Sequence, residues 1–123
     1  MTDWIGQQAA QIAAPQEVQV ATRRSDGSLR RATTIWIVRD GDRVFIRSTN
    51  GRTADWFRGA TATGTGQIIS GGRATDVVFT EAAEANLPAV DSAYRRKYSQ
   101  YASIVDHLVQ EGPRSATLQL QPA

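Results

Sequence analysis

Three short glycine-containing turns constrain this chain more than any other feature of its sequence. The stretch "SDGS" at 25–28, Asp40-Gly41 and Gly71-Gly72 each separate two segments rich in β-branched and aromatic residues. Two-residue loops of this kind favour the tight turns that join neighbouring antiparallel strands into a hairpin. The sequence therefore predicts a series of hairpins and a mainly β fold.

The strands predicted around these turns are short and regularly spaced. Alternation of apolar and polar residues, or a continuous apolar run, places strands at 17–24, 30–39, 43–49, 66–70, 73–82 and 115–121. Six such strands are too many for a small flat sheet without cover. We therefore expect them to close into a six-stranded antiparallel β-barrel, which leaves no free sheet edge.

The alternation also predicts which side chains face the interior. In the last strand it places Ala116, Leu118 and Leu120 inward. It places Thr117, Gln119 and Gln121 outward. In the strand at 43–49, Arg47 and Thr49 share a face with Phe45, opposite Val44 and Ile46.

Helices are predicted on either side of the strands. Helical spacing of apolar residues indicates helices at 3–14, 53–60, 86–101 and 102–110, the last ending at Gly112-Pro113. In the third, Val90, Tyr94, Tyr98 and Tyr101 recur along one side, which predicts packing against the barrel. We expect one domain, in which an N-terminal helix within residues 1–15 packs on a barrel formed by residues 16–123.

Composition excludes several classes of function. Cysteine is absent and His107 is the only histidine, so no metal site and no cysteine nucleophile are expected. The net charge is only +2, with acidic residues scattered among the basic ones, and this argues against a nucleic-acid partner. Neither a signal peptide nor an apolar run of membrane length is present, which predicts a soluble, cytoplasmic protein without a membrane partner.

The stretch "FIRSTNGRTADWF" at 45–57 is the strongest candidate for a binding site. Arg47, Ser48 and Thr49 offer a guanidinium and two hydroxyl donors at a strand end, and Gly51 and Arg52 follow in the turn before a helix. Guanidinium groups, exposed N–H groups and helix N-termini all favour phosphate. The alternative is an ordinary strand end with solvated polar side chains.

Two tryptophans are candidates for contact with a flat ligand. Trp36 lies in the continuous apolar run of the strand at 30–39, and Trp56 lies in the predicted helix at 53–60. Aromatic side chains and the backbone of a strand pack well against a planar ring. The alternative is that both tryptophans belong to the core, and for Trp56 the sequence favours that alternative.

Taken together, these segments resemble a bacterial domain family of unknown function, number 2255. The pieces "IWIV", "IRS", "NG", "GG" and "AYRRKY" occur in the expected order, and the resemblance covers about residues 17–122. This family is related to the flavin-binding split-barrel superfamily, which includes pyridoxamine-phosphate oxidase-like proteins. The central block is also similar to deazaflavin-dependent nitroreductases. Two positions depart from that second pattern, Thr34 in place of a proline and Gly59 in place of an asparagine.

The resemblance implies a six-stranded antiparallel split barrel that forms a homodimer and binds FMN or a deazaflavin. By the same resemblance, Arg47, Ser48, Thr49, Gly51 and Arg52 would hold the phosphate. Thr34, Ile35 and Trp36 would lie along the ring, with Trp56 as a further contact. The protein would then be an oxidoreductase that reduces a small electrophile such as a quinone. The alternative is a non-catalytic ligand-binding or dimeric interaction module of the same fold.

Overall fold

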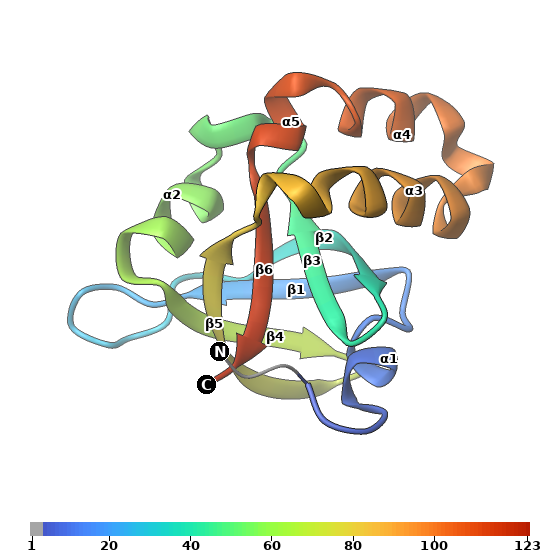
Figure 1. The fold of residues 1–123 in the computed structure, drawn as a ribbon. Coiled ribbons are helices and arrows are strands. Elements are labelled where there is room, and N and C mark those ends of the chain that lie inside the picture. Colours follow the sequence, from blue (N-terminus) through green and yellow to red (C-terminus); the bar gives the residue numbers. More distant parts are fainter. Residues whose placement is uncertain (1–3) are drawn as a thin grey trace.

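The computed structural model describes residues 4–123 and shows a closed antiparallel barrel with helices around it (Figure 1). Its strands are β1 (Glu17–Thr22), β2 (Thr33–Asp40), β3 (Arg43–Arg47), β4 (Thr65–Ser70), β5 (Arg73–Glu81) and β6 (Thr117–Pro122). They follow one another around the barrel in the order β1-β2-β3-β6-β5-β4. An isolated bridge between Arg23 and Leu29 lies in the segment that connects β1 to β2. The predicted mainly β barrel with flanking helices is confirmed.

Within residues 4–123, five α-helices surround the barrel. They are α1 (Gln8–Ile12), α2 (Asp55–Thr63), α3 (Leu87–Lys97), α4 (Ala102–Leu108) and α5 (Glu111–Ser115). Short 3-10 turns occupy Gly51–Thr53, Glu84–Asn86 and Ser99–Tyr101. In Figure 1, α3, α4 and α5 cover one side of the barrel, α2 lies beside it, and α1 lies at the opposite end from α4 and α5. No helix within residues 4–123 has the length and apolar character needed to cross a membrane.

Two apolar clusters hold these layers together. The first fills the barrel and contains the inward residues of all six strands, among them Val20, Ile37, Ile46, Ile68 and Leu118. The second lies between the outer face of β2 and β3 and the helices α3 and α4; it contains Val38, Phe45, Val90, Tyr94, Tyr98, Val105 and Leu108. Because β3 contributes to both clusters, both of its faces are buried. The predicted stripe on α3 packs as expected, with Val90, Tyr94 and Tyr98 buried.

This second layer corrects the prediction for β6. Ala116, Leu118 and Leu120 are buried as expected, but Thr117 is also buried, at 2% exposure, and so is Gln121. Thr117 is covered because α3 and α5 pack outside this end of the strand, where its hydroxyl accepts from Arg47 Nε at 2.8 Å and donates to the Arg114 carbonyl at 2.7 Å. Strand alternation alone predicts that the outer face of β6 is exposed to solvent. It cannot predict that a second layer of helices covers that face.

Helix boundaries also differ from the predictions. From residue 4 onward, the predicted helix at 3–14 is helical only over Gln8–Ile12, and its first position lies outside the described residues. Trp4 precedes this helix and its indole N–H donates to the Leu120 carbonyl at 2.9 Å, so the segment packs on the barrel before it becomes helical. Pro113 does not end the helical region, because it falls in the first turn of α5, where proline costs no hydrogen bond.

Lys97, the only lysine of the sequence, fastens α3 to the barrel. Its half-buried ammonium donates to the carbonyls of Ala13, Pro15 and Ile37 at 2.6, 2.7 and 2.8 Å. Burial lowers the pKa of Lys97 to about 8, so the group still carries its charge at neutral pH. One side chain therefore joins the end of α1, the segment that leads into β1 and the middle of β2.

We expect Lys97→Met to lower the free energy of unfolding by about 2 kcal/mol, because a hydrogen bond to a charged group contributes roughly 1.5–3 kcal/mol. Denaturant unfolding at pH 7 measures the change. Arg96→Met is the matched control, since Arg96 immediately precedes Lys97 in the same helix and is exposed. Equal stability of both variants and the wild type would contradict the fastening role of Lys97.

Candidate functional site

The barrel opens between β2 and β3. In β2, residues Thr33–Trp36 pair with β1, through Val20–Glu17. Pairing with β3 begins only at Ile37, which lies opposite Ile46. Beyond this point β3 follows β6, with Arg47 opposite Thr117 and the Ser48 N–H donating to the Ala116 carbonyl at 3.1 Å. We call the unpaired edge of Thr33–Trp36 the seam.

Backbone polar groups face this seam. The Ile37 N–H donates to the Tyr98 hydroxyl at 3.1 Å, and that hydroxyl donates to the Gln16 carbonyl at 2.6 Å, so the polar groups of Ile37 point toward β1. Backbone polar groups point to alternate sides of a strand. Those of Thr34 and Trp36 therefore point away from β1, to the side on which β2 has no strand partner. The seam presents the N–H and C=O groups of Thr34 and the N–H group of Trp36 to a ligand, because the terminal Ile37–Ile46 pair places the Trp36 carbonyl against the Arg47 N–H.

A pocket of about 320 Å³ lies at the seam, between β2 and α4. We call it the β2–α4 pocket. It brings together much of the predicted site, namely Thr34, Ile35, Trp36, Arg47 and Thr49. Sequence analysis missed the remaining lining residues, Glu17, Ile104 and Leu108, because none of them carries a local signal. Ile104 and Leu108 stand four residues apart on α4, so the helix places both beside the pocket.

Trp36 belongs both to the core and to this pocket. Tyr98 stacks on its indole ring with the centroids 3.9 Å apart and the planes 4° from parallel. Tyr101 also contacts it, at 5.5 Å and a tilt of 46°. Since Tyr98 covers one face, Trp36 offers the pocket its other face or its edge. The two predicted alternatives for Trp36, ring contact and core, are thus compatible.

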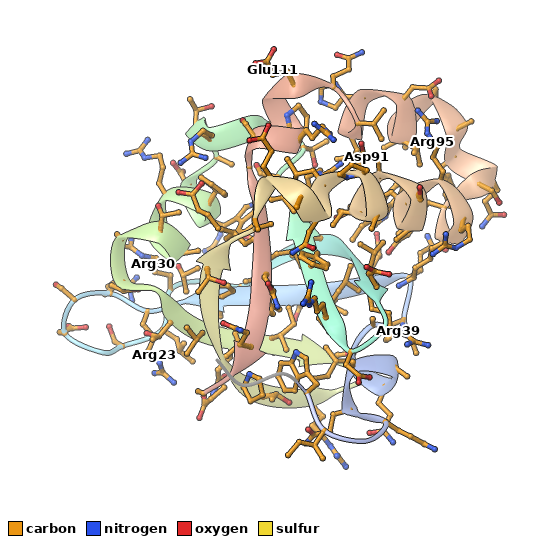
Figure 2. All side chains as sticks on the ribbon, in the orientation of Figure 1. Arg23, Arg30, Arg39, Asp91, Arg95 and Glu111 are labelled. Carbon is orange, nitrogen blue, oxygen red and sulfur yellow. The ribbon has the colours of Figure 1, made fainter. Side chains whose placement is uncertain are left out.

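Arg47 is the buried charge of the site. Its side chain has no exposed surface, and its Nη1 donates to Asp91 Oδ1 at 2.6 Å and to the Leu108 carbonyl at 3.0 Å. Asp91 also accepts from Arg114 Nε at 3.0 Å. Figure 2 shows Asp91 on α3, on the side facing α4 and α5. The second terminal nitrogen, Arg47 Nη2, is buried and has no partner within residues 4–123.

The other members of the predicted phosphate cradle lie apart from the β2–α4 pocket. Ser48 is buried, and its hydroxyl has no partner in the part of the chain that the structure describes. Gly51 adopts φ +71° against the backbone of Gly112 in α5. Arg52 forms an exposed bidentate pair with Glu81 at 2.7 and 3.0 Å, which lowers the pKa of Glu81. The structure therefore divides the cradle instead of gathering it around one point.

A second pocket, of about 240 Å³, lies at the start of α2 and is called the α2 pocket below. It contains the predicted residue Trp56 together with Thr33 of the seam, and its lining also includes Val20, Thr22, Arg30, Arg31 and Asp55. Trp56 packs against the barrel core as well, with Phe57 in edge contact at 6.0 Å. Thr33 borders the α2 pocket and Thr34 borders the β2–α4 pocket, so the seam connects the two.

Arg30 and Arg31 are candidate binding residues that the sequence analysis did not single out. Neither guanidinium has a carboxylate partner within ion-pair distance among residues 4–123, in contrast to Arg47 and Arg52. Figure 2 shows Arg30 beside α2. The N-cap of α2, Ala54, provides no side-chain cap, so the first N–H groups of this helix remain available to an anion. The Arg-Arg pair immediately before the second strand was the available signal.

Gly59 in α2 allows this helix to pack closely against Thr22 of β1 and against Arg30. A Cβ atom at this position would lie 2.6 Å from Thr22 Oγ1 and 3.4 Å from Arg30 Nε. Real Cβ contacts are longer than the first of these, so Thr22 would have to move. The nitroreductase pattern has asparagine at this position. Glycine replaces it here because a side chain would clash with Thr22.

We expect Gly59→Ala to lower the free energy of unfolding by about 1–3 kcal/mol through overpacking, despite the better helix propensity of alanine. Thermal or urea unfolding measures the effect. Gly112→Ala is the control, because a Cβ there meets no atom within 4 Å. A Gly59 variant as stable as the Gly112 variant would show that α2 can shift freely away from β1.

No group of three His, Cys, Asp or Glu side chains within residues 4–123 is arranged to hold a metal ion. His107 lies on α4 with Nε2 at 2.7 Å from the Thr49 carbonyl. The polar side chains that line the two pockets are arginines, threonines and the carboxylates of Glu17 and Asp55.

This closed antiparallel barrel, with a seam beside β2, has the split-barrel fold of the solved structures described below. Residues 8–120 match the family DUF2255, described as uncharacterized proteins conserved in bacteria, and the chain belongs to that family. Among curated proteins, none matches significantly.

Solved structures similar to this chain share the fold at low sequence identity. The haem storage protein HutZ from Vibrio cholerae has a TM-score of 0.65 at 16% identity, covering 88% of this chain and 82% of its own. An F420-H2-dependent reductase has a TM-score of 0.65 at 14% identity, covering 86% and 94%. A domain-swapped dimer also has a TM-score of 0.65 at 14% identity, covering 86% and 80%.

Proposed function

We propose that this protein binds a flavin-type cofactor, FMN or a deazaflavin, along the seam and acts as an oxidoreductase on a small electrophile. The observation that carries the proposal is the seam itself. A strand edge with unpaired N–H and C=O groups lies between a pocket with an aromatic wall and a pocket with two arginines that form no ion pair within residues 4–123. A flavin has the same sequence of parts, a planar ring with hydrogen-bonding heteroatoms at one end and a phosphate at the other.

The ring end of the proposal rests on β2. The backbone groups of Thr34 and Trp36 can pair with the donors and acceptors of a ring, and Ile35 and Trp36 supply apolar contact. Ile104 and Leu108 add apolar surface to the pocket from α4. These residues fit a flavin-type ring in chemistry, and they retain the predicted roles of Thr34, Ile35 and Trp36.

For the phosphate end we propose the α2 pocket. Arg30 and Arg31 bring two positive charges that have no carboxylate partner in the described part of the chain, Thr33 adds a hydroxyl, and the uncapped start of α2 adds N–H donors. Arg52 stands just before α2, and its exposed pair with Glu81 contributes only about 0–1 kcal/mol, so it can exchange Glu81 for a phosphate. Arg47 is different, because its partners are buried. Its predicted contact with the phosphate stays a prediction, as do those of Ser48, Thr49 and Gly51.

When bound, a flavin-type group supplies hydride transfer, and the protein contributes binding, orientation and exclusion of water. In this chain Trp36 is held rigidly by Tyr98, so it fixes the plane against which a ring can pack. Thr34 and Thr49 supply hydroxyl groups at the rim of the pocket. No thiol is present in the chain to act as a nucleophile.

The proposed assembly is a homodimer in which a second copy covers the seam. Thr34 is exposed in the single chain, and Ile104 is 44% exposed beside it, so the pocket is open on that side. The domain-swapped dimer with the same fold supports an assembly of two copies. Covering this side would complete the water-excluded site.

We expect FMN to bind more tightly than riboflavin, which lacks the phosphate, and Arg31→Ala to remove most of that difference. The loss in FMN binding free energy should be roughly 1.5–3 kcal/mol, the range for a hydrogen bond to a charged group. Fluorescence titration measures both ligands, and the deazaflavin cofactor is titrated alongside. Arg39→Ala is the matched control, because Arg39 is exposed at the far end of β2.

The same titration with Arg47→Ala separates the two possible phosphate sites. Loss of phosphate-dependent binding in a folded Arg47 variant, with Arg31→Ala unchanged, would return the phosphate to the predicted cradle. Oxidation of the reduced cofactor by a quinone, followed spectroscopically, then tests catalysis. Binding without turnover of any electrophile would favour the alternative of a non-catalytic module.

A further inference from the structure

Arg47 brings a buried positive charge to the lining of the β2–α4 pocket. Its carboxylate partner Asp91, at 2.6 Å, is shared with Arg114 at 3.0 Å. Arg47 has no exposed side-chain surface, and its Nη2 is without a partner in the described chain. A buried guanidinium with an unused N–H group is costly unless something accepts from it. The lining of the pocket thus contains a buried guanidinium with an unused donor.

The rim of the same pocket carries a different charge. Glu17 lines it from the start of β1, but it is exposed, so water and salt screen its carboxylate. Thr49 adds a hydroxyl on the Arg47 side, and its carbonyl is already in contact with His107. The buried charge of Arg47 is screened less than the exposed charge of Glu17. The net preference of the pocket is therefore for an anion.

The shape of the pocket selects among anions. Its walls are the Trp36 ring and the aliphatic side chains of Ile35, Ile104 and Leu108. A volume of about 320 Å³ is at the lower end of the range for small-molecule sites and suits one or two fused rings. A strongly hydrated ion such as free phosphate would gain nothing from these walls.

We propose that the β2–α4 pocket binds a planar aromatic or unsaturated carboxylate, with its ring against Trp36 and its carboxylate toward Arg47 and Thr49. Binding of such a molecule needs only this chain's own residues. The cofactor ring of the proposed function would use the same wall of Ile35 and Trp36, so the acid and the cofactor ring would compete for this pocket.

The test uses 2-naphthoate and its neutral analogue 2-naphthylmethanol, titrated calorimetrically into the full chain without added cofactor. We expect the acid to bind at least about tenfold more tightly than the alcohol, since a charged hydrogen bond contributes roughly 1.5–3 kcal/mol. Equal affinity of the two, or no binding of the acid, would overturn the proposal.

Two substitutions at exposed positions locate the binding. Ile104→Glu places a carboxylate at the rim and should weaken 2-naphthoate at least about tenfold, because it opposes the anion and narrows the pocket. Ile5→Glu changes the net charge equally at a residue that is 75% exposed and outside the pocket, and it should leave the affinity unchanged. An unchanged affinity in the Ile104 variant would place the acid elsewhere and overturn the proposal.

A third substitution separates charge selection from simple packing. Glu17→Gln removes the rim carboxylate and should strengthen binding of 2-naphthoate while leaving 2-naphthylmethanol unchanged. Arg47→Gln should abolish the preference for the acid. If that variant fails to fold, the Glu17 and Ile104 variants still show whether the acid binds in this pocket through its charge. If the protein binds 2-naphthoate but no flavin, the proposed anion site stands and the proposed cofactor is wrong. If it binds a flavin but not 2-naphthoate, the proposed cofactor stands and the proposed anion site is wrong.

Discussion

The buried guanidinium of Arg47 is the contact on which the arrangement of helices and strands depends. It joins β3 to β6 through Thr117, to α3 through Asp91 and to the end of α4 through the Leu108 carbonyl. Through Asp91 it also reaches Arg114 of α5. A buried ion pair adds little net stability compared with apolar packing, but loss of one partner is strongly destabilising. Its main effect here is to fix which helices cover which end of β3.

That arrangement in turn determines the seam. Because β3 ends at Arg47 and its continuation pairs with β6, it leaves one edge of the first half of β2 without a strand partner, while the other edge pairs with β1. An open strand edge is normally a liability in a soluble protein. In this fold the edge lies between two pockets: Thr33 lines the α2 pocket, and Thr34–Trp36 line the β2–α4 pocket. The binding surface is thus a direct product of strand register and does not require an inserted loop.

Much of the fold followed from the sequence, because its signals are local. The hairpins at Asp40-Gly41 and Gly71-Gly72 and the stripe from Val90 to Tyr98 depend on neighbouring residues only. The predicted environment of Thr117 was wrong, since the helices that cover it come from a distant part of the chain. Arg30 and Arg31 were missed for the same reason. Their importance depends on α2, which begins more than twenty residues later and has no capping side chain.

The candidate site was predictable in its parts but not in its grouping. Thr34, Ile35, Trp36, Arg47 and Thr49 do meet at one pocket, as a site built on two adjacent strands suggests. Nothing in the spacing of Arg47 and Arg52 indicates that one is buried against Asp91 and the other exposed against Glu81. These carboxylates are distant in sequence, so only the tertiary structure assigns them.

The position of β6 has a consequence for how this barrel forms. β6 follows every other described element in the chain, yet it lies between β3 and β5. During synthesis, both of those strands emerge with an unpaired edge, and the Leu120 carbonyl that accepts from Trp4 is not yet present. Closure requires contacts between the two ends of the chain, which makes folding slow and leaves the incomplete barrel open to association through its edges. The barrel can therefore close only after β6, its last strand in the chain, has been synthesised.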